Sequence, residues 1–190
     1  LTLREITAEN PLSRERQAVL RRGEHQIQVP DIPITHQQIA AAARTSGPGV
    51  APQAPARAVL QFLTPTRLIL GEHLVKPETF IFRPFLHRLI TRLEDLSREF
   101  SDTPLALDVP TLLDAAGRVQ VVDNRLSWVE VSSYSTRRHA SAPTSGLVGT
   151  VVLQSADWAP FWTWLLWGQF VHVGKDAVKG NGWYTLAAGG

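Results

Sequence analysis

The stretch WLLWGQFVHVGKDAVKGNGWY, residues 164–184, indicates the fold most directly. An apolar segment, which begins near Asp157, gives way to a segment with three glycines and then to Trp183 and Tyr184. Asp157 is a typical cap, and large apolar side chains follow it at spacings of three and four. We therefore predict a helix over 158–171, a glycine-rich loop over 174–182 and a last strand over 183–186.

Upstream of this stretch, helix-like and strand-like patterns alternate. The run AVLQFL at 58–63 is typical of a short buried strand, and 78–100 has the periodicity of a long amphipathic helix whose arginines fall off the apolar face. The later segments are a weaker helix or irregular crossover at 104–116, strand composition at 119–134 interrupted by Asp123 and Asn124, and a strand at 146–154. This order predicts an α+β, ferredoxin-like split βαβ fold, an antiparallel sheet with two helices on one face.

The first 55 residues predict a separate piece of the chain. A strand at 1–6 and an Ala-rich helix at 33–44, capped by Thr35, precede the Pro/Gly-rich linker TSGPGVAPQAP at 45–55. We place the domain boundary there, with a partial N-terminal region at 1–55 and the ferredoxin-like domain at 56–190. The chain starts at Leu1 and has no Met, so we expect it to be part of something longer.

Composition excludes several classes of chemistry. The absence of Cys excludes disulfides, thiolate metal sites and cysteine nucleophiles. No GxSxG, HExxH or Walker pattern occurs, so any catalysis is expected to need neither metal nor cofactor. The absence of Cys also agrees with a reducing cytosol, so we expect a cytoplasmic protein. The uncharged run 158–173 is shorter than the roughly 20 residues of a membrane span and predicts a buried helix. The net charge of +2 decides nothing until the charges are located.

The glycine-rich segment is suited to an anion. Gly174, Gly180 and Gly182 allow positive φ and close approach, exposed amides can form a nest, and Lys175 and Lys179 supply positive charge. Phosphate is the expected guest. The alternative is a tight helix-to-strand turn with solvated lysines.

A second polar segment, SSYSTRRH at 132–139, has the residue types that bind RNA. Arg137 and Arg138 can contact phosphates, Tyr134 can stack on a base, and His139 can transfer a proton. His172 is the other candidate acid or base, because it opens the glycine-rich segment. The alternative is a solvated turn and two histidines without a role in catalysis.

A ferredoxin-like module that ends in such a loop resembles the RAMP superfamily of CRISPR-associated RNA-binding proteins. The loop of that superfamily reads Gly, apolar, Gly, five residues with a Lys or Arg, Gly, apolar, Gly. This chain has His172-Val173-Gly174, KDAVK and Gly180-Asn181-Gly182, and so departs at the first Gly and at Asn181. With LQFLTPTRL at 60–68, RLITRLEDLSREF at 88–100 and SYSTRRHASAPTSGLVG at 133–149, residues 58–187 are similar to the second domain of the Cas6 family.

The resemblance implies a metal-independent endoribonuclease that processes precursor CRISPR RNA by attack of a ribose 2′-hydroxyl, giving a 2′,3′-cyclic phosphate and a 5′-hydroxyl. It implies no cofactor, repeat RNA as partner, and other Cas proteins as further candidates. On this chain the catalytic candidates are His139 and His172, and the RNA-binding candidates are Tyr134, Arg137, Arg138, Gly174, Lys175, Lys179, Gly180 and Gly182.

Two alternatives remain open. Family members usually carry two ferredoxin-like domains, often with the catalytic histidine in the first, and this chain holds only the tail of such a domain. The chain would then be a non-catalytic subunit or fragment that holds guide RNA. The other alternative is a protein-interaction module whose basic residues keep it in solution.

Overall fold

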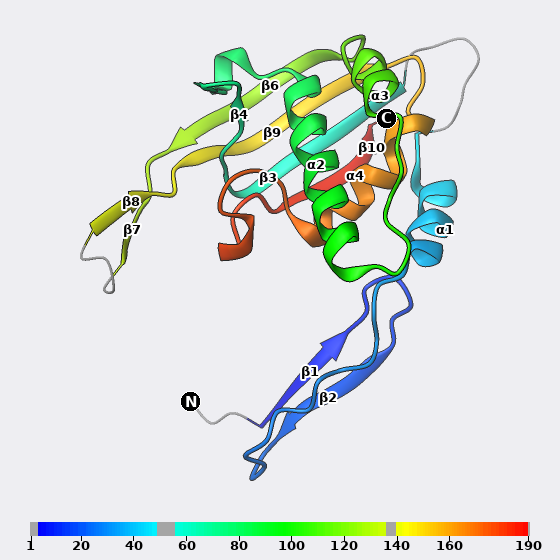
Figure 1. Cartoon of the computed structure of the whole chain (residues 1–190), viewed down its shortest axis with the longest axis vertical. Coiled ribbons are helices and arrows are strands. Elements are labelled where there is room, and N and C mark those ends of the chain that lie inside the picture. Colours follow the sequence, from blue (N-terminus) through cyan, green and yellow to red (C-terminus); the bar gives the residue numbers. More distant parts are fainter. Residues whose placement is uncertain (1–3, 49–55, 136–139, 190) are drawn as a thin grey trace. The chain divides into compact units, whose positions relative to one another are not determined.

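The computed structural model describes residues 4–48, 56–135 and 140–189 (Figure 1). They form two compact units, residues 1–45 and 46–190. The expected boundary between 55 and 56 stays a prediction, because 49–55 lie outside the described residues. Within the described part of the chain, no helix has the length and apolar character that a membrane span requires.

The N-terminal unit contains a hairpin and a helix. Strands β1 (Glu5–Glu9) and β2 (Arg16–Arg21) pair antiparallel, and α1 (His36–Ser46) follows. The predicted cap at Thr35 is present: its hydroxyl accepts from the Gln38 amide at 3.3 Å, and the Gln38 side chain accepts from the Thr35 amide at 3.0 Å.

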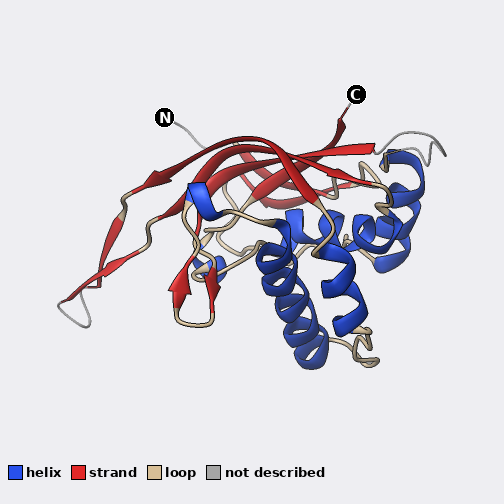
Figure 2. Cartoon of the chain, turned by 90° about the horizontal axis from the view of Figure 1, so that it is seen from above, coloured by secondary structure: helices blue, strands red, loops and turns tan. Residues whose placement is uncertain are grey.

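The C-terminal unit has the predicted ferredoxin-like fold. Its antiparallel sheet has the order β10-β3-β9-β6, formed by β3 (Ala56–Thr66), β6 (Gln120–Val129), β9 (Gly146–Ser155) and β10 (Tyr184–Gly189). Helices α2 (Phe82–Phe100) and α4 (Ala159–Val171) lie on one face of the sheet, as Figure 2 shows. The split βαβ connection places the last strand beside the first.

The core lies between the sheet and these helices. Along β3, Ala58, Leu60 and Phe62 are buried while the residues between them are more exposed, which is the period of a half-buried strand. Phe62 meets Phe85 of α2 edge-to-face, with ring centroids 5.6 Å apart. Tyr184 is fully buried, and burial raises its pKa.

The remaining elements refine the predicted boundaries. A 3-10 turn, η1 (Pro77–Thr79), precedes α2, and Phe100 at the end of α2 is 84 % exposed although its spacing predicted burial. The predicted strand at 119–134 is two strands, because β7 (Ser132–Ser135) leaves the sheet and pairs with β8 (Ala140–Pro143). The other elements are β4 (Ile69–Leu70), β5 (His73–Leu74), α3 (Val109–Ala116) and η2 (Ala177–Lys179).

Candidate functional site

The glycine-rich loop, residues 172–183, connects α4 to β10 and has an unusual backbone. Five of its residues have φ between 62° and 88°: His172, Gly174, Asp176, Gly180 and Gly182. Residues other than glycine pay conformational energy in this left-handed region. The backbone therefore explains why glycine occupies three of the five positions.

Two of these glycines are also required by close packing. A Cβ at Gly174 would lie 2.6 Å from the carbonyl oxygen of Arg67, and a Cβ at Gly182 would collide with the carbonyl oxygen of Val173. The loop is thereby fixed to the end of β3: the Lys175 amide donates to Arg67 O at 2.9 Å and the Gly182 amide to Pro65 O at 3.1 Å. The loop is built as a rigid structure.

The predicted anion nest across the loop is smaller than its sequence suggested. Six amides of the loop donate to carbonyl oxygens of the chain itself. They are the amides of His172, Val173, Lys175, Lys179, Gly180 and Gly182. Any bound anion would therefore depend on side chains more than on a continuous row of amides.

The two lysines of the loop have different surroundings. Lys179 forms an ion pair with Asp176, with 2.7 Å between Nζ and Oδ1, so part of its charge is already compensated. Lys175 is exposed, and among the described residues it forms no ion pair with a carboxylate.

His172 is held by its neighbours in the loop. Its ring stacks on Trp183, with centroids 6.3 Å apart and planes at 12°, and its Nδ1 lies 3.2 Å from the carbonyl oxygen of Asn181. Because a carbonyl oxygen only accepts, this contact assigns the proton to Nδ1. The imidazole then offers Nε2 for proton exchange.

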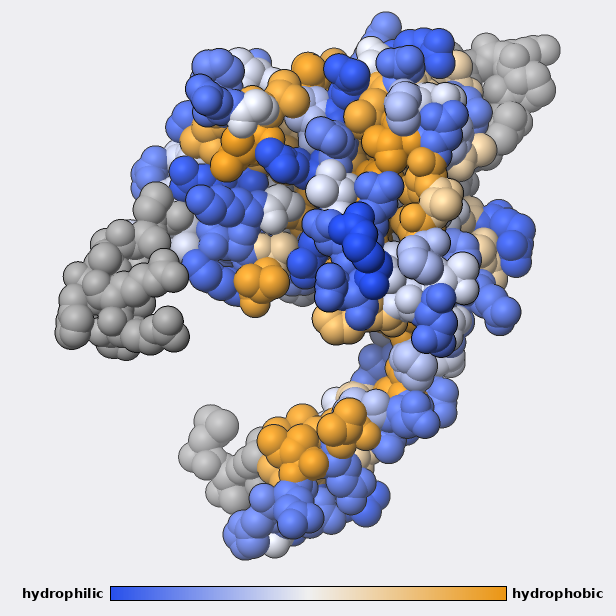
Figure 3. All heavy atoms as spheres, viewed as in Figure 1, coloured by the Kyte–Doolittle hydropathy of each residue, from blue (hydrophilic) through white to orange (hydrophobic). Residues whose placement is uncertain are grey.

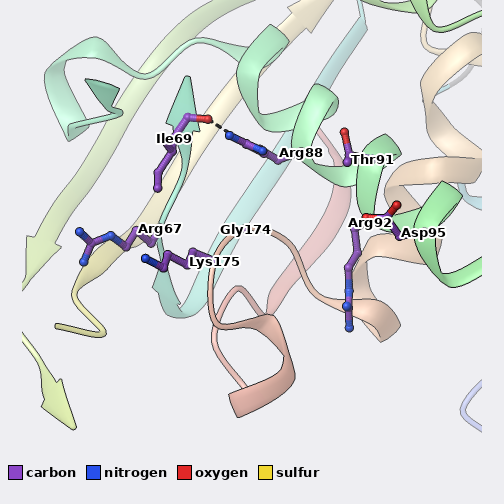
Figure 4. A pocket seen from close by; sticks show the side chains of 8 residues that line it. All are labelled: Arg67, Ile69, Arg88, Thr91, Arg92, Asp95, Gly174 and Lys175. Atoms are coloured by element: carbon purple, nitrogen blue, oxygen red, sulfur yellow. Dashed lines mark hydrogen bonds between the residues drawn. The ribbon is translucent and has the colours of Figure 1, made fainter. Parts of the chain in front are cut away.

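A basic pocket of about 380 Å³ lies beside the loop. Its lining is shown in Figure 4: Arg67, Ile69, Arg88, Thr91, Arg92, Asp95, Gly174 and Lys175. Arg88 and Arg92 come from neighbouring turns of α2, and Lys175 extends alongside Arg67. Figure 3 shows mostly hydrophilic surface over α2 and the loop.

The three arginines of this pocket were not predicted as site residues. Arg88 and Arg92 fall on the polar face of a predicted helix, where most arginines are merely solvated. The available signal was their spacing of four, on a helix that follows the strand beside the loop. The sequence around Arg67 does not indicate a site residue, because Arg67 reaches the loop only through the pairing of its backbone with Lys175.

The second predicted segment begins next to the loop. The Asn181 side chain donates to the Thr144 carbonyl oxygen at 3.3 Å, and Thr144 immediately follows the β7–β8 hairpin. In that hairpin Tyr134 pairs with Ser141. Arg137, Arg138 and His139 lie outside the described residues, as does the side chain of Tyr134. The structure thus brings the base of one predicted segment to the other.

Glu130 fixes the base of this hairpin and was not found from the sequence. Its carboxylate accepts from the Ser145 hydroxyl at 2.7 Å and from the Trp128 indole at 2.6 Å. These hydrogen bonds, with the nearby charges of Lys76 and Arg67, lower the pKa of Glu130. Lys76 also lies over the Trp128 ring, 3.9 Å from its centroid.

Acidic and histidine side chains do not cluster as metal ligands in the described part of the chain. No group of three or more His, Asp or Glu residues there is arranged to hold an ion.

Solved structures share the fold. Cas6 of Thermus thermophilus matches with a TM-score of 0.55 and 14 % identity over 80 % of this chain and 58 % of that one. A Cas6 product complex matches with a TM-score of 0.54 and 16 % identity, over 81 % of this chain and 55 % of that one. A partial Cas6-RT-Cas1–Cas2 complex matches with a TM-score of 0.60 and 14 % identity, over 86 % of this chain and 28 % of that one. The chain therefore spans little more than half the length of the first two, and no curated protein matches it.

The model of one protein family, CRISPR-associated endoribonuclease Cas6, matches residues 60–184. This match extends from β3 through α2, α4 and the whole glycine-rich loop, and thus includes the basic pocket. Since it covers more than half of the sequence, the chain belongs to the Cas6 family of CRISPR-associated endoribonucleases.

Proposed function

We propose that this chain binds CRISPR repeat RNA through the glycine-rich loop and is part of an endoribonuclease that processes precursor CRISPR RNA. The observation that carries the proposal is the family match, which contains the loop from His172 to Trp183. The loop is held against β3 and presents Lys175 without a carboxylate partner among the described residues. A cation on a backbone that is already held in place suits a polyanion, because little backbone order has to be gained on binding.

The reaction requires two proton transfers and no metal. The ribose 2′-oxygen attacks the adjacent phosphorus and loses its proton to a base, while the bond from phosphorus to the 5′-oxygen breaks and that oxygen takes a proton from an acid. The products are a 2′,3′-cyclic phosphate and a 5′-hydroxyl. Each positioned acid or base contributes roughly 10² to 10⁴ in rate, and positive charge stabilises the phosphorane.

His172 is the described residue best placed to act as one of these groups. Its Nδ1 donates to Asn181, so Nε2 is the atom that would exchange a proton with the RNA. His139 is the second candidate on this chain. In the sequence His139 stands between β7 and β8. The described part of that hairpin ends at Pro143, next to Thr144, whose carbonyl oxygen accepts from Asn181 of the loop.

The second candidate function is RNA binding without cleavage by this chain alone. The favouring observation is that the chain spans 58 % of the matching Thermus Cas6, so a residue needed for proton transfer can lie in the remainder of the protein. The glycine-rich loop and Lys175 would then bind the RNA, and a residue in the remainder of the full-length protein would transfer the proton.

The test is incubation of repeat RNA with this chain and with the full-length protein in EDTA, followed by a denaturing gel. The proposal expects cleavage at one position by the full-length protein, and loss of cleavage with a 2′-deoxy group there. His172→Ala should reduce the rate at least about 10²-fold. The matched control is His73→Ala, at an exposed position that begins β5. Cleavage that requires added metal would contradict the mechanism, and absence of RNA binding would overturn the function.

A further inference from the structure

Three cations of the basic pocket, Arg88, Arg92 and Lys175, have no carboxylate partner within the described part of the chain. Four cations line it, against one carboxylate, Asp95, which pairs with Arg98 at 3.1 Å. Like charges four residues apart on a helix repel each other. The positive charges of this pocket favour binding of an anionic ligand.

The two helix arginines are oriented in advance. Arg88 donates from Nε to the carbonyl oxygen of Ile69 at 2.8 Å, and Arg92 from Nε to that of Val171 at 3.4 Å. Both side chains are half-buried. Since each bond uses the Nε hydrogen, the Nη groups remain as donors, and the guanidinium lies in a fixed plane. This arrangement lowers the entropy cost of forming two parallel hydrogen bonds to an oxyanion.

The size of the pocket leaves room for a phosphate group. Its volume, about 380 Å³, is at the small end of ligand sites. Thr91 stands between the two arginines in the sequence of α2, and its hydroxyl donates to the His87 carbonyl oxygen at 2.9 Å. RNA has no carboxylate groups, so the anion that it can place in the pocket is a backbone phosphate. Lys175 belongs to both the pocket and the glycine-rich loop, so a strand on the loop can continue onto α2.

We propose that the pocket formed by Arg88, Arg92 and Lys175 binds a backbone phosphate of the RNA and so directs the strand from the loop onto helix α2. This inference rests on the proposed function and deepens it, because it assigns the path of the RNA to a helix surface as well as to the loop. The shared chemistry is that of a phosphate, whether in RNA or free in solution.

The test is RNA binding by the full-length protein over a range of salt concentrations. The Arg88→Gln/Arg92→Gln variant should bind repeat RNA about tenfold or more weakly and lose about 0.7 to 0.9 from the log–log salt slope for each lost phosphate contact. The matched control is Arg83→Gln/Arg118→Gln, which removes the same charge from exposed positions outside the pocket. Arg83 also donates from Nε to a carbonyl oxygen, that of Leu113.

A second variant leaves both arginines in place. Thr91→Glu puts a carboxylate into the pocket and should weaken RNA binding at least as much, while far-ultraviolet circular dichroism reports whether the fold is intact. If wild type binds RNA and both pocket variants bind equally well at an unchanged salt slope, the inference is overturned and the proposed function stands. If wild type does not bind RNA, the proposed function fails first.

Inorganic phosphate distinguishes the source of the ligand. In ¹⁵N spectra, RNA should shift the Nε–H signals of Arg88 and Arg92, assigned from the single Gln variants, and should leave that of Arg83 in place. Equal shifts with millimolar phosphate alone and none with RNA would assign the pocket to a free anion and contradict the proposal.

Discussion

The imidazole of His172 lies parallel to the indole of Trp183, with planes at 12° and centroids 6.3 Å apart. The two residues are the first and last of the glycine-rich loop, so their stacking closes the loop at its base. Trp183 is 44 % exposed, and its own amide donates to the Thr64 hydroxyl at 2.9 Å. The orientation of a candidate catalytic imidazole therefore depends on a tryptophan next to it.

Removal of this ring should loosen the loop. Trp183→Ala is expected to lower the free energy of unfolding by about 0.5–1.5 kcal/mol, the usual contribution of an aromatic pair, and to reduce cleavage along with stability. Trp183→Phe keeps a stacking face and should restore most of both. Urea unfolding and a cleavage assay measure the two effects, and equal loss with Phe and Ala would contradict the role of stacking.

Two glycines of the loop should respond very differently to substitution. Gly180 and Gly182 both have positive φ, but a Cβ at Gly180 meets nothing within 4 Å, whereas one at Gly182 collides with Val173 O. Gly180→Ala should cost about 1–2 kcal/mol for the left-handed backbone alone. Gly182→Ala should cost at least about 1 kcal/mol more, since the backbone must also shift. Urea midpoints compare the two, and equal costs would contradict the packing described here.

Acid should weaken the base of the β7–β8 hairpin through Glu130. Its pKa is lowered in the folded chain, first by the Ser145 hydroxyl and then by the Trp128 indole. A carboxyl with a depressed folded pKa adds stability above its unfolded pKa, near 4.5, and loses it as the pH falls through the folded value. Glu130→Gln should therefore flatten the fall in stability below about pH 4.5.

Ser145→Ala provides the control for that titration, because it removes the largest cause of the pKa shift and retains the carboxyl. Unfolding measured from pH 3 to 7 should show a smaller flattening than in Glu130→Gln. The double variant should titrate like Glu130→Gln alone. A Glu130→Gln variant that kept the wild-type pH dependence would exclude this carboxyl as its source.

The order of the elements was predictable because the spacing of apolar residues along a strand or a helix follows directly from its geometry. Alternation along 58–62 reflects the pleat of β3, and the spacing of three and four after Asp157 reflects a helix on a core. Asp157 itself lies two residues before the helix, which begins at Ala159 with Trp158 as the N-cap, although its carboxylate accepts from the Ala159 amide at 2.8 Å. Phe100 is exposed although it continues the apolar spacing, because it is the last residue of α2 and the buried side chains of that helix end at Leu93.

The site was predictable only in the parts that are local in sequence. Positive φ at Gly174, Gly180 and Gly182 follows from the residue type. The pocket does not, because it forms where the Lys175 amide meets the Arg67 carbonyl oxygen, a contact across more than 100 residues. The single sequence also gave no reason to separate Arg88 and Arg92 from the solvated arginines of the chain.

The last prediction concerns the contact between Gly168 of α4 and Tyr184 of β10. The Tyr184 hydroxyl donates to the Leu165 carbonyl oxygen at 2.6 Å, and a Cβ at Gly168 would collide with that hydroxyl and approach Leu89 to 2.8 Å. Gly168→Ala should therefore destabilise the C-terminal unit by about 1–3 kcal/mol, although alanine favours helices. Tyr184→Phe alone should cost about 1–2 kcal/mol, because it removes the buried hydrogen bond.

The double variant decides whether the collision is the cause. Without the hydroxyl, the collision is replaced by closer-than-usual contacts with the ring carbon Cζ of residue 184, at 2.9 Å, and with the flexible end of Leu89, at 2.8 Å. Gly168→Ala/Tyr184→Phe should therefore be more stable than the sum of the two single costs predicts. Residues in contact commonly couple by about 0.5–3 kcal/mol, which urea unfolding resolves. Strict additivity would mean that the helix and the last strand do not touch at this point, and would contradict the packing that sets where the glycine-rich loop begins and ends.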